Sequence, residues 1–348
     1  ERHGYDPTYS YWAPPPMSYL FINSIPLAHT GNELRKAWES GIRKLWVLNV
    51  GALKPLEQDV EFFLRCGWDA GKKDSITKDT DAFVEDWINR NFSGMHGKMA
   101  AALYNIYAQT TNMRKVEHMD NHVFSQTAWN NEAGRRVLRL KEMFDGGNAI
   151  YAALPDQEKD AFFQMFLMKM HASYFTALEY YYADRSQLSY NRGNMAGADE
   201  YIRFSRKAAG YRRWMIHYYN KVMAGGKWDR ILTPERFSPP PTALYPAGTP
   251  ALYLGKPEMT LYMGETDLTR EGTITFDFWG SHVKALELGN KGAGKISYRA
   301  AVTEGSEWLK LSGETGACNS GAYNIEEILY LEAKKSWDGE NKEGILEI

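Results

Sequence analysis

Polar side chains follow an apolar run near the start of the chain, where the end of a strand would place them. Leu45-Trp46-Val47-Leu48 is rich in strand formers, and Asn49-Val50-Gly51-Ala52-Leu53-Lys54-Pro55-Leu56-Glu57 comes directly after it. In α/β folds, functional groups stand at the carboxyl ends of parallel strands, beside the positive N-terminus of the next helix. Asn49 could hydrogen-bond a hydroxyl group there, and Lys54 could pair with the carboxylate of a ligand. We therefore predict a binding site at this strand end.

Glu57 and the first residues of the chain are further candidates, each with an alternative. Glu57 could contact a ligand, although its place in the first turn of a helix favours a simple capping role. Arg2 and His3 lie in an opening loop that either lines the same pocket or is frayed surface. An arginine there would suit a carboxylate, because its planar guanidinium can form two parallel hydrogen bonds.

The sequence predicts no metal and no cofactor. His118 and His122 are four residues apart, which on a helix could hold a metal ion. The catalytic form of that motif needs Glu after the first His, and Met119 stands there instead. We interpret the pair as a connection between helices. The chain also lacks a Gly-rich nucleotide fingerprint and a nucleophile elbow.

Composition bounds the function classes. The 348 residues carry a net charge of -2, so no excess positive field exists for nucleic acid or an anionic membrane. No apolar run approaches the ~20 residues of a membrane-spanning helix. Aromatic residues reach 14%, with 11 Trp and 22 Tyr. Such rings either stack on sugars or fill a large core, and composition does not decide between these uses.

Periodicity divides the chain into zones, which predict a multidomain fold with α/β, all-α and all-β parts. In residues 1–73, apolar runs at 19–22 and 45–48 flank a helical segment at 32–40, and a second helix follows Pro55. Such a βαβ unit needs further strands, so we expect them upstream of Glu1 and interpret this zone as the terminal part of a (β/α)8 barrel. Residues 74–230 repeat apolar side chains at helical spacing and predict an antiparallel helical bundle.

The last third of the chain predicts strands. Residues 231–257 contain Pro239-Pro240-Pro241 and are interpreted as a Pro-rich linker. Residues 258–348 alternate apolar and polar side chains, as in 273–278 and 295–302, and Gly-rich turns separate these runs. This pattern predicts a β-sandwich. Its last residues, 344–348, form a strand that stops without a turn, so we expect the domain to be truncated.

Several segments together resemble one enzyme family. They are Asn49 to Glu57, Phe62-Phe63-Leu64, Trp68-Asp69, Arg114 to Glu117, Asn131-Glu132-Ala133, Leu154-Pro155, Asp160 to Phe163, and Ala224 to Trp228. In this order they resemble the family 115 glycoside hydrolases, the xylan α-glucuronidases. The Pro-rich segment and the strands after it also follow that family's order. The chain departs from the family at Ala52, where Asp is usual, and near Arg2, where an aromatic residue is usual.

The resemblance implies an enzyme that removes (4-O-methyl-)glucuronic acid from glucuronoxylan with inversion of configuration. It also implies a homodimer that is secreted or periplasmic. Inversion needs a carboxylic acid and a carboxylate on either side of the scissile bond. The family's candidate carboxylates lie on earlier barrel strands, so we expect this chain alone to be inactive. The part of the pocket present here would comprise Arg2, His3, Asn49, Lys54 and Glu57.

A rival hypothesis from another class is a non-catalytic carbohydrate-binding or assembly module. Such a module would use aromatic side chains of the helical and strand zones to hold a polysaccharide or a second subunit. Exposure discriminates the two hypotheses, because binding needs aromatic rings on the surface whereas a structural role buries them.

Overall fold

The computed structural model describes residues 5–9, 22–50, 53–72, 79–232, 255–319 and 326–348. The chain forms two compact units that interleave along the sequence. Unit 1 comprises residues 1–120, 136–179 and 207–240, and unit 2 comprises 121–135, 180–206 and 241–348. Most of the predicted Pro-rich linker, residues 233–254, lies outside the described residues.

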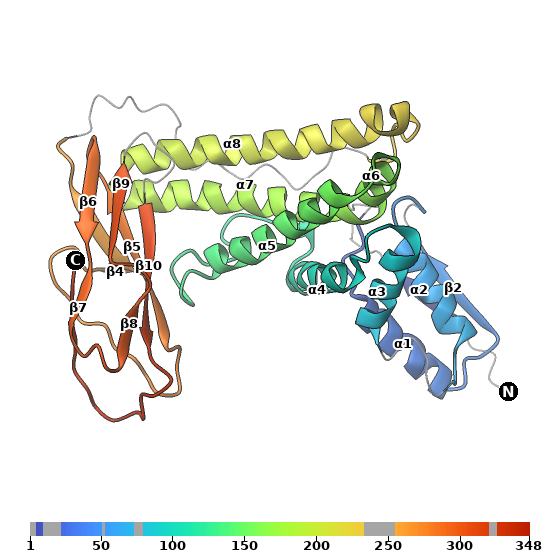
Figure 1. The fold of residues 1–348 in the computed structure, drawn as a ribbon, viewed down its shortest axis with the longest axis horizontal. Helices are drawn as coiled ribbons and strands as arrows, with labels where there is room; N and C mark the ends of the chain where they lie inside the picture. The colour runs from blue at the N-terminus through green and yellow to red at the C-terminus, as the bar shows by residue number, and fades with distance from the viewer. Residues whose placement is uncertain (1–4, 10–21, 51–52, 73–78, 233–254, 320–325) are drawn as a thin grey trace. The chain divides into compact units, whose positions relative to one another are not determined.

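Unit 1 begins with a parallel strand pair and two helices. Strands β1 (Tyr5–Tyr9) and β2 (Leu45–Asn49) pair in register, with Tyr9 opposite Asn49. Helix α1 (Leu27–Glu39) connects them, and α2 (Glu57–Trp68) follows β2 (Figure 1). Gly41 lies just beyond α1 with φ 92°, a left-handed conformation that glycine adopts without steric cost. Glycine at this position therefore suits the end of the helix.

Most of the strand predicted at 19–22 is not among the described residues and stays a prediction. Residues 19–21 lie outside the described residues, and Ile22 is buried in coil. The side chain of Asn23 accepts a hydrogen bond from the Ile25 N–H at 2.9 Å and turns the chain into the helix. Among the described residues, β2 pairs with β1, which lies in a segment predicted as an opening loop.

The middle of the chain is helical, as predicted. Its helices are α3 (Thr80–Asn91), α4 (Gly97–Met113), η2 (Val116–His118), α5 (Glu132–Ala153), α6 (Asp156–Phe162), η3 (Phe163–Leu167), α7 (Met168–Asn191), α8 (Met195–His217), η4 (Tyr218–Val222) and η5 (Met223–Gly226). Pro155 directly precedes α6, and Gly225 and Gly226 adopt φ values of 64° and 79°. Proline just before a helix start and glycine just after a helix end are local residue preferences at such boundaries.

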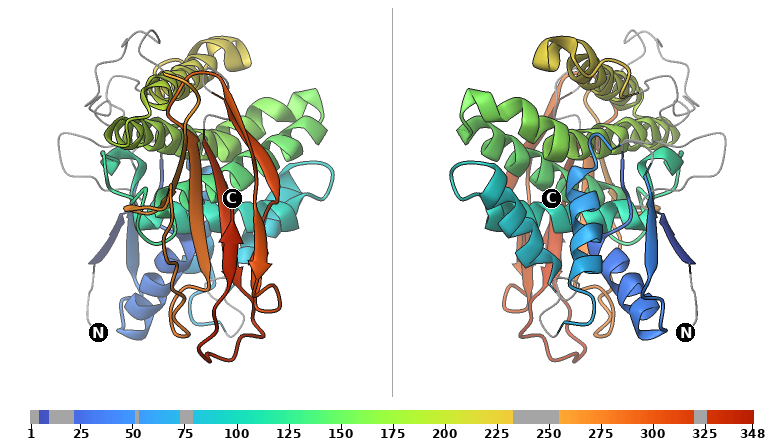
Figure 2. Two further views of the ribbon diagram at one scale, coloured as in Figure 1. Left: turned by 90° about the vertical axis from the view of Figure 1, so that its left-hand side faces the viewer. Right: turned by 90° about the vertical axis from the view of Figure 1, so that its right-hand side faces the viewer.

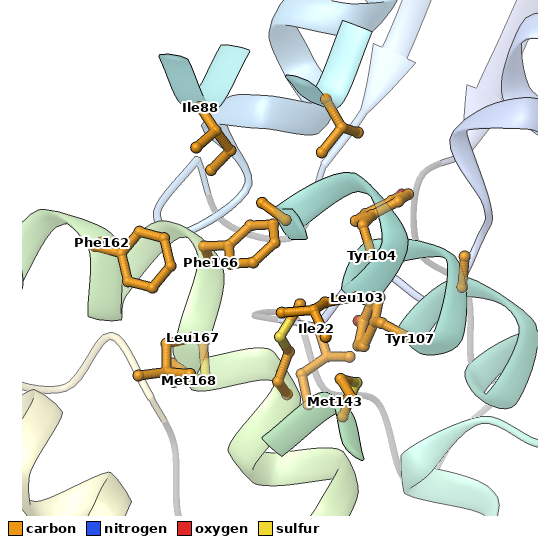
Figure 3. Close-up of a cluster of buried hydrophobic side chains, with 14 of the residues drawn as sticks. Ile22, Ile88, Leu103, Tyr104, Tyr107, Met143, Phe162, Phe166, Leu167 and Met168 are labelled. Carbon is orange, nitrogen blue, oxygen red and sulfur yellow. The ribbon is translucent and has the colours of Figure 1, made fainter. Parts of the chain in front are cut away.

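The core of unit 1 is built from apolar side chains of several helices. Figure 3 shows Phe162, Phe166, Leu103 and Met143 converging with Tyr107. Phe162 packs on Phe166 with ring centroids 5.3 Å apart. Aromatic rings of these helices are therefore largely used for packing within unit 1.

One histidine lies within an aromatic cluster of unit 1. The His171 ring centroid is 4.6 Å from that of Phe144 and 5.7 Å from those of Phe163 and Phe175. Its Nε2 lies 3.2 Å from the Asn148 side-chain oxygen. Burial among these rings disfavours the imidazolium and lowers the pKa of His171 to about 4.

We expect the stability of unit 1 to fall as the pH drops through this range. Below pH ~6.5 the imidazole of His171 becomes protonated in the unfolded chain but stays neutral in the folded chain. The free energy of unfolding therefore falls as the pH drops from about 6.5 to 4. The expected loss in the free energy of unfolding is roughly 2 kcal/mol. This value is smaller than the full pKa shift would give, because the His171 ring is partly exposed. Urea unfolding at pH 7, 5 and 4 measures it, with His171→Phe as the comparison. An equal pH dependence in this variant would contradict the assignment.

Unit 2 contains antiparallel strands. They are β3 (Met259–Met263), β4 (Thr266–Asp267), β5 (Val283–Asn290), β6 (Lys295–Arg299), β7 (Ala301–Glu304), β8 (Leu309–Leu311), β9 (Thr315–Asn319), β10 (Glu326–Ala333) and β11 (Ile345–Glu347). Five form a sheet of order β4-β3-β5-β10-β8, and β6–β9 and β7–β11 form separate pairs. The left view of Figure 2 shows these orange and red strands.

The alternating patterns of unit 2 predict some strands correctly and one wrongly. Residues 295–302 contain β6 and the start of β7, as predicted. Residues 273–278 form no strand. Ile274 and Phe276 pack against the apolar core of unit 2, and the side chain of Asp277 accepts a hydrogen bond from the Trp279 N–H at 2.9 Å. The apolar side chains are thus partly buried without a sheet ladder.

A buried charge network joins helical and strand segments within unit 2. Arg185, only 1% exposed, donates to Glu326 at 2.5 and 2.8 Å and to Glu287 at 3.1 Å. Arg192 donates to the same Glu287 oxygen at 2.6 Å, and the Tyr201 hydroxyl donates to Glu326 at 3.0 Å. Despite burial, the arginine beside Glu326 holds the pKa of that carboxyl below its ordinary value. These charge-assisted bonds compensate the desolvation of the buried charges.

Across the described ranges, none of the helices combines the length and the apolar character that crossing a membrane requires.

Candidate functional site at the start of helix α2

The predicted site residues fall at the end of β2 and the start of α2, in unit 1. Asn49 is the last residue of β2 and is half-buried, and Lys54 and Glu57 follow across the connection to α2. Arg2 and His3 lie outside the described residues. Within the described chain, Lys54 and Glu57 come into contact, and no hydrogen bond or ion pair joins Asn49 to either of them.

Lys54 and Glu57 form an ion pair beside an aromatic ring. The Lys54 ammonium contacts Glu57 Oε1 and lies 5.2 Å from the ring centroid of Trp228. Both Glu57 carboxylate oxygens are shielded from solvent, and apart from the Lys54 ammonium they have no polar partner among the described residues. Glu57 is also the first residue of α2, where negative charge favours the helix dipole. A ligand carboxylate at this place would therefore share Lys54 with Glu57.

The next two residues of α2 carry polar groups into the interior. Asp59 accepts a hydrogen bond from the Asn23 amide at 2.6 Å, and both Asp59 and Gln58 are buried. The second Asp59 oxygen and the Gln58 amide nitrogen lack a hydrogen-bond partner among the described residues. A buried polar atom without a partner is costly, so each one calls for a physical explanation such as water or a bound group.

A buried lysine completes the cluster from the other side. Lys169 is 3% exposed, and its Nζ lies 3.4 Å from Gln58 Oε1. The same ammonium lies 5.2 and 5.4 Å from the ring centroids of Tyr104 and Tyr107. Burial lowers the pKa of Lys169, and the negative charges of Asp59 and Glu57 oppose that shift. Aromatic faces and these carboxylates thus partly offset the loss of hydration.

The cluster balances two ammonium groups against two carboxylates. Lys54 and Lys169 face Glu57 and Asp59, with the Trp228 ring at the edge. Such a set can bind hydroxyl and carboxylate groups, because it offers fixed donors and acceptors away from bulk water. In the part of the chain that the structure describes, no group of three or more His, Cys, Asp or Glu side chains could hold a metal ion.

Sequence reasoning did not find Lys169, Asp59 or Trp228. Lys169 had a usable signal: it lies three residues after Phe166 and one before Met170, on a face whose spacing predicted burial. A lysine on a buried helix face needs a partner, which marks it as a candidate. Trp228 follows Gly225 and Gly226 at a helix end, and nothing local indicates that it meets Lys54.

Comparison with known proteins bears on this same segment. Residues 3–118 match the family model described as Glycosyl hydrolase family 115. The resemblance to family 115 is confirmed. The matched part includes Asn49, Lys54, Glu57 and Asp59 and ends before Lys169.

A solved structure of family 115 is similar over most of the chain. It is a family GH115 4-O-methyl-α-glucuronidase, BtGH115A, with specificity for decorated arabinogalactans. The TM-score is 0.56 at 15% sequence identity, and the match covers 94% of this chain and 49% of that one. The chain thus has a mixed helical and antiparallel-sheet fold similar to family 115 and spans about half the length of that protein. No curated protein matches the chain.

Proposed function

We propose that this chain is part of an α-glucuronidase-like glycoside hydrolase that removes (4-O-methyl-)glucuronic acid from glucuronoxylan with inversion. The observation that carries the proposal is the family 115 match over residues 3–118, which includes the Lys54 strand end. An ammonium group beside an aromatic ring suits a uronate, whose carboxylate pairs with the cation while its ring packs on the indole. Lys54 and Trp228 provide this combination. Decorated arabinogalactan is a second substrate class, supported by the name of the similar structure.

Inversion places a general acid and a general base about 6.5–9.5 Å apart, with water between them. We assign neither role to Glu57 or Asp59. Glu57 is engaged by Lys54, and Asp59 by Asn23. In this proposal Lys54 and its neighbours position the uronate, and the catalytic pair is supplied by strands outside this chain.

The finer architecture belongs to the same proposal. We infer that β1 to α2 form the terminal part of a (β/α)8 barrel, that the helices form an antiparallel bundle, and that the strands of unit 2 form a β-sandwich. The parallel β1–β2 pair with its connecting helix and the antiparallel order of the five-stranded sheet support this assignment. Homodimer formation and secretion or export to the periplasm stay predictions from the family resemblance.

The 348-residue chain itself tests the proposal. We expect it to be retarded by glucuronoxylan in affinity electrophoresis while it releases no uronic acid above the enzyme-free blank, because it binds the uronate without the catalytic pair. Released uronic acid is quantified by anion-exchange chromatography. Detectable release would contradict the placement of the acid and base outside this chain. Failure of the chain to bind decorated xylan or arabinogalactan would contradict the proposed function.

A further inference from the structure

A row of aromatic side chains lies along the last turns of α8 and the start of η4, within unit 1. The row comprises Tyr211, Trp214 and Tyr218, which are three and four residues apart and therefore lie on one side of the helix. Tyr211 is 47% exposed and Trp214 is 60% exposed. This segment is the yellow part of α8 in Figure 1. Large exposed aromatic side chains that gather on one surface often mark a binding site.

Contacts with neighbouring rings hold the aromatic row in place. Tyr211 stacks on Phe175 of α7, with ring centroids 5.4 Å apart and 28° between the ring planes. Trp214 stacks on Tyr218 at 5.4 Å and 19°. Tyr218 in turn contacts Phe163 edge to face, with ring centroids 5.1 Å apart. Rings that are fixed before a ligand arrives lose little conformational entropy on binding, so the row is a preformed platform.

A glycine leaves a gap beside Trp214. Gly210 lies within α8, and a Cβ placed on it would meet no atom of the described residues within 4 Å. Glycine inside a helix is less favourable than alanine, and neither a close neighbour nor a positive φ requires it here. Tyr218 comes one turn after Trp214 and Gly210 one turn before it, so the indole face turned away from Tyr218 borders this gap. A ligand ring placed in the gap would therefore lie against an open aromatic face.

The charges around the gap favour an acidic ligand. Residues 201–222 contain no Asp or Glu. Lys207 and Arg213 each lie three residues from Gly210, one on either side of it in the sequence, and both are exposed. The Lys207 ammonium lies 5.7 Å from the ring centroid of Tyr211. Two cationic side chains thus flank the gap on the same side of the helix as the aromatic row.

Two carboxylates near this segment are already bonded within the protein. Glu179 is buried and accepts a hydrogen bond from Arg212. Asp160 lies at the far end of the row and accepts a hydrogen bond from the Tyr218 hydroxyl at 3.4 Å. Arg213 itself forms no ion pair with a carboxylate of the described residues. Its guanidinium can therefore pair with an anionic group of a ligand.

We propose that this part of α8 is a binding surface for an acidic polysaccharide. One pyranose ring fills the gap at Gly210 and stacks on the open face of Trp214, and a uronate carboxylate of the same chain pairs with Arg213. Aromatic faces take the C–H side of a sugar ring, and a planar guanidinium holds a carboxylate through two parallel hydrogen bonds. The proposal uses neither Lys54 nor Glu57 and does not depend on the function proposed for them.

Fluorine NMR of the chain labelled with 5-fluorotryptophan tests this surface directly. The Trp214 resonance is assigned with Trp214→Phe, and the experiment uses a Lys54→Met background so that the strand-end site does not contribute. We expect xylotetraose decorated with 4-O-methylglucuronic acid to shift the Trp214 resonance. Undecorated xylotetraose should bind about tenfold more weakly, because it lacks the carboxylate that pairs with Arg213. The resonance of Trp68, 84% exposed on α2, is the control and should not move.

Two variants separate binding from folding. Gly210→Gln fills the gap with a side chain that suits a helix, so it should keep or raise the unfolding midpoint while it weakens binding about tenfold or more. Arg213→Gln should remove the preference for the decorated oligosaccharide and leave the midpoint unchanged. Arg35→Gln removes an arginine of α1 whose side chain is 47% exposed, and as the matched control it should change neither property.

Each outcome bears on the proposal. A Trp214 resonance unmoved by the decorated oligosaccharide overturns it, and so does unchanged binding in Gly210→Gln. Equal affinity for the two oligosaccharides overturns the pairing of a uronate with Arg213. Equal or tighter binding of a single-stranded oligothymidylate at Trp214 would assign the surface to nucleic acid and likewise overturn the proposal. A shift at Trp214 in the Lys54→Met background supports the proposal whether or not the strand end holds a uronate.

Discussion

Replacing Arg185 with alanine is expected to destabilise unit 2 by about 3–5 kcal/mol, the cost of breaking a buried ion pair. Arg185 is the group that donates to both Glu287 and Glu326. Its removal leaves the Glu326 carboxylate buried with the Tyr201 hydroxyl and weaker neutral donors as its hydrogen-bond donors in the described residues. An uncompensated buried charge costs more than the pair contributed, so the effect should be large.

Denaturant unfolding followed by circular dichroism measures this change, and two variants sharpen it. Arg203→Ala removes an arginine of α8 that is 65% exposed and pairs with Glu200, and it should change stability by less than about 1 kcal/mol. Arg185→Lys should restore only part of the loss, because one ammonium cannot reproduce a planar fork that bridges two carboxylates. Equal stability of Arg185→Ala and Arg203→Ala would contradict the role given to the network.

Local signals predict the helices of this chain better than its strand pairings. Pro155 before α6, Gly41 after α1 and Gly225 after the α8 region act within one turn, so the neighbouring residues suffice to place the boundaries. The β1–β2 pairing joins residues about 40 positions apart, and no local pattern specifies that partner. The strand prediction at residues 273–278 is wrong for the opposite reason. Apolar and polar side chains alternate there as in a strand, but the apolar ones pack against the core without any pairing of the backbone in a sheet.

The candidate site shows the same limit. Lys54 and Glu57 are three residues apart at a helix start, so their meeting follows from sequence spacing. Lys169 reaches Gln58 across 111 residues, and this contact depends on tertiary packing. The buried charge network of unit 2 could likewise not be predicted from neighbouring residues, because Arg185 lies 141 residues from Glu326 in the sequence. The many aromatic residues show both of the environments considered for them, a packed core and an exposed surface. Phe162 and Phe166 are buried in the core, whereas Trp129 is exposed.

Loss of the Lys54 charge is the second large effect that we expect. A hydrogen bond to a charged group contributes roughly 1.5–3 kcal/mol, which corresponds to about a 10- to 100-fold change in affinity. Lys54→Met should therefore weaken binding of a uronate-decorated oligosaccharide by at least about tenfold. Lys54→Arg keeps the positive charge and should retain most of the affinity. Lys72→Met is the matched control, because Lys72 also pairs with a carboxylate three residues away, Asp69, but is 58% exposed and stands away from the strand end.

The most direct test of the account is isothermal titration calorimetry of these variants with 4-O-methylglucuronic acid-decorated xylotetraose. The account predicts at least tenfold weaker binding for Lys54→Met, near-parental binding for Lys54→Arg, and no change for Lys72→Met. Unfolding midpoints measured on the same samples show whether each variant is folded. Unchanged affinity in a folded Lys54→Met variant would contradict the claim that this strand end holds the uronate.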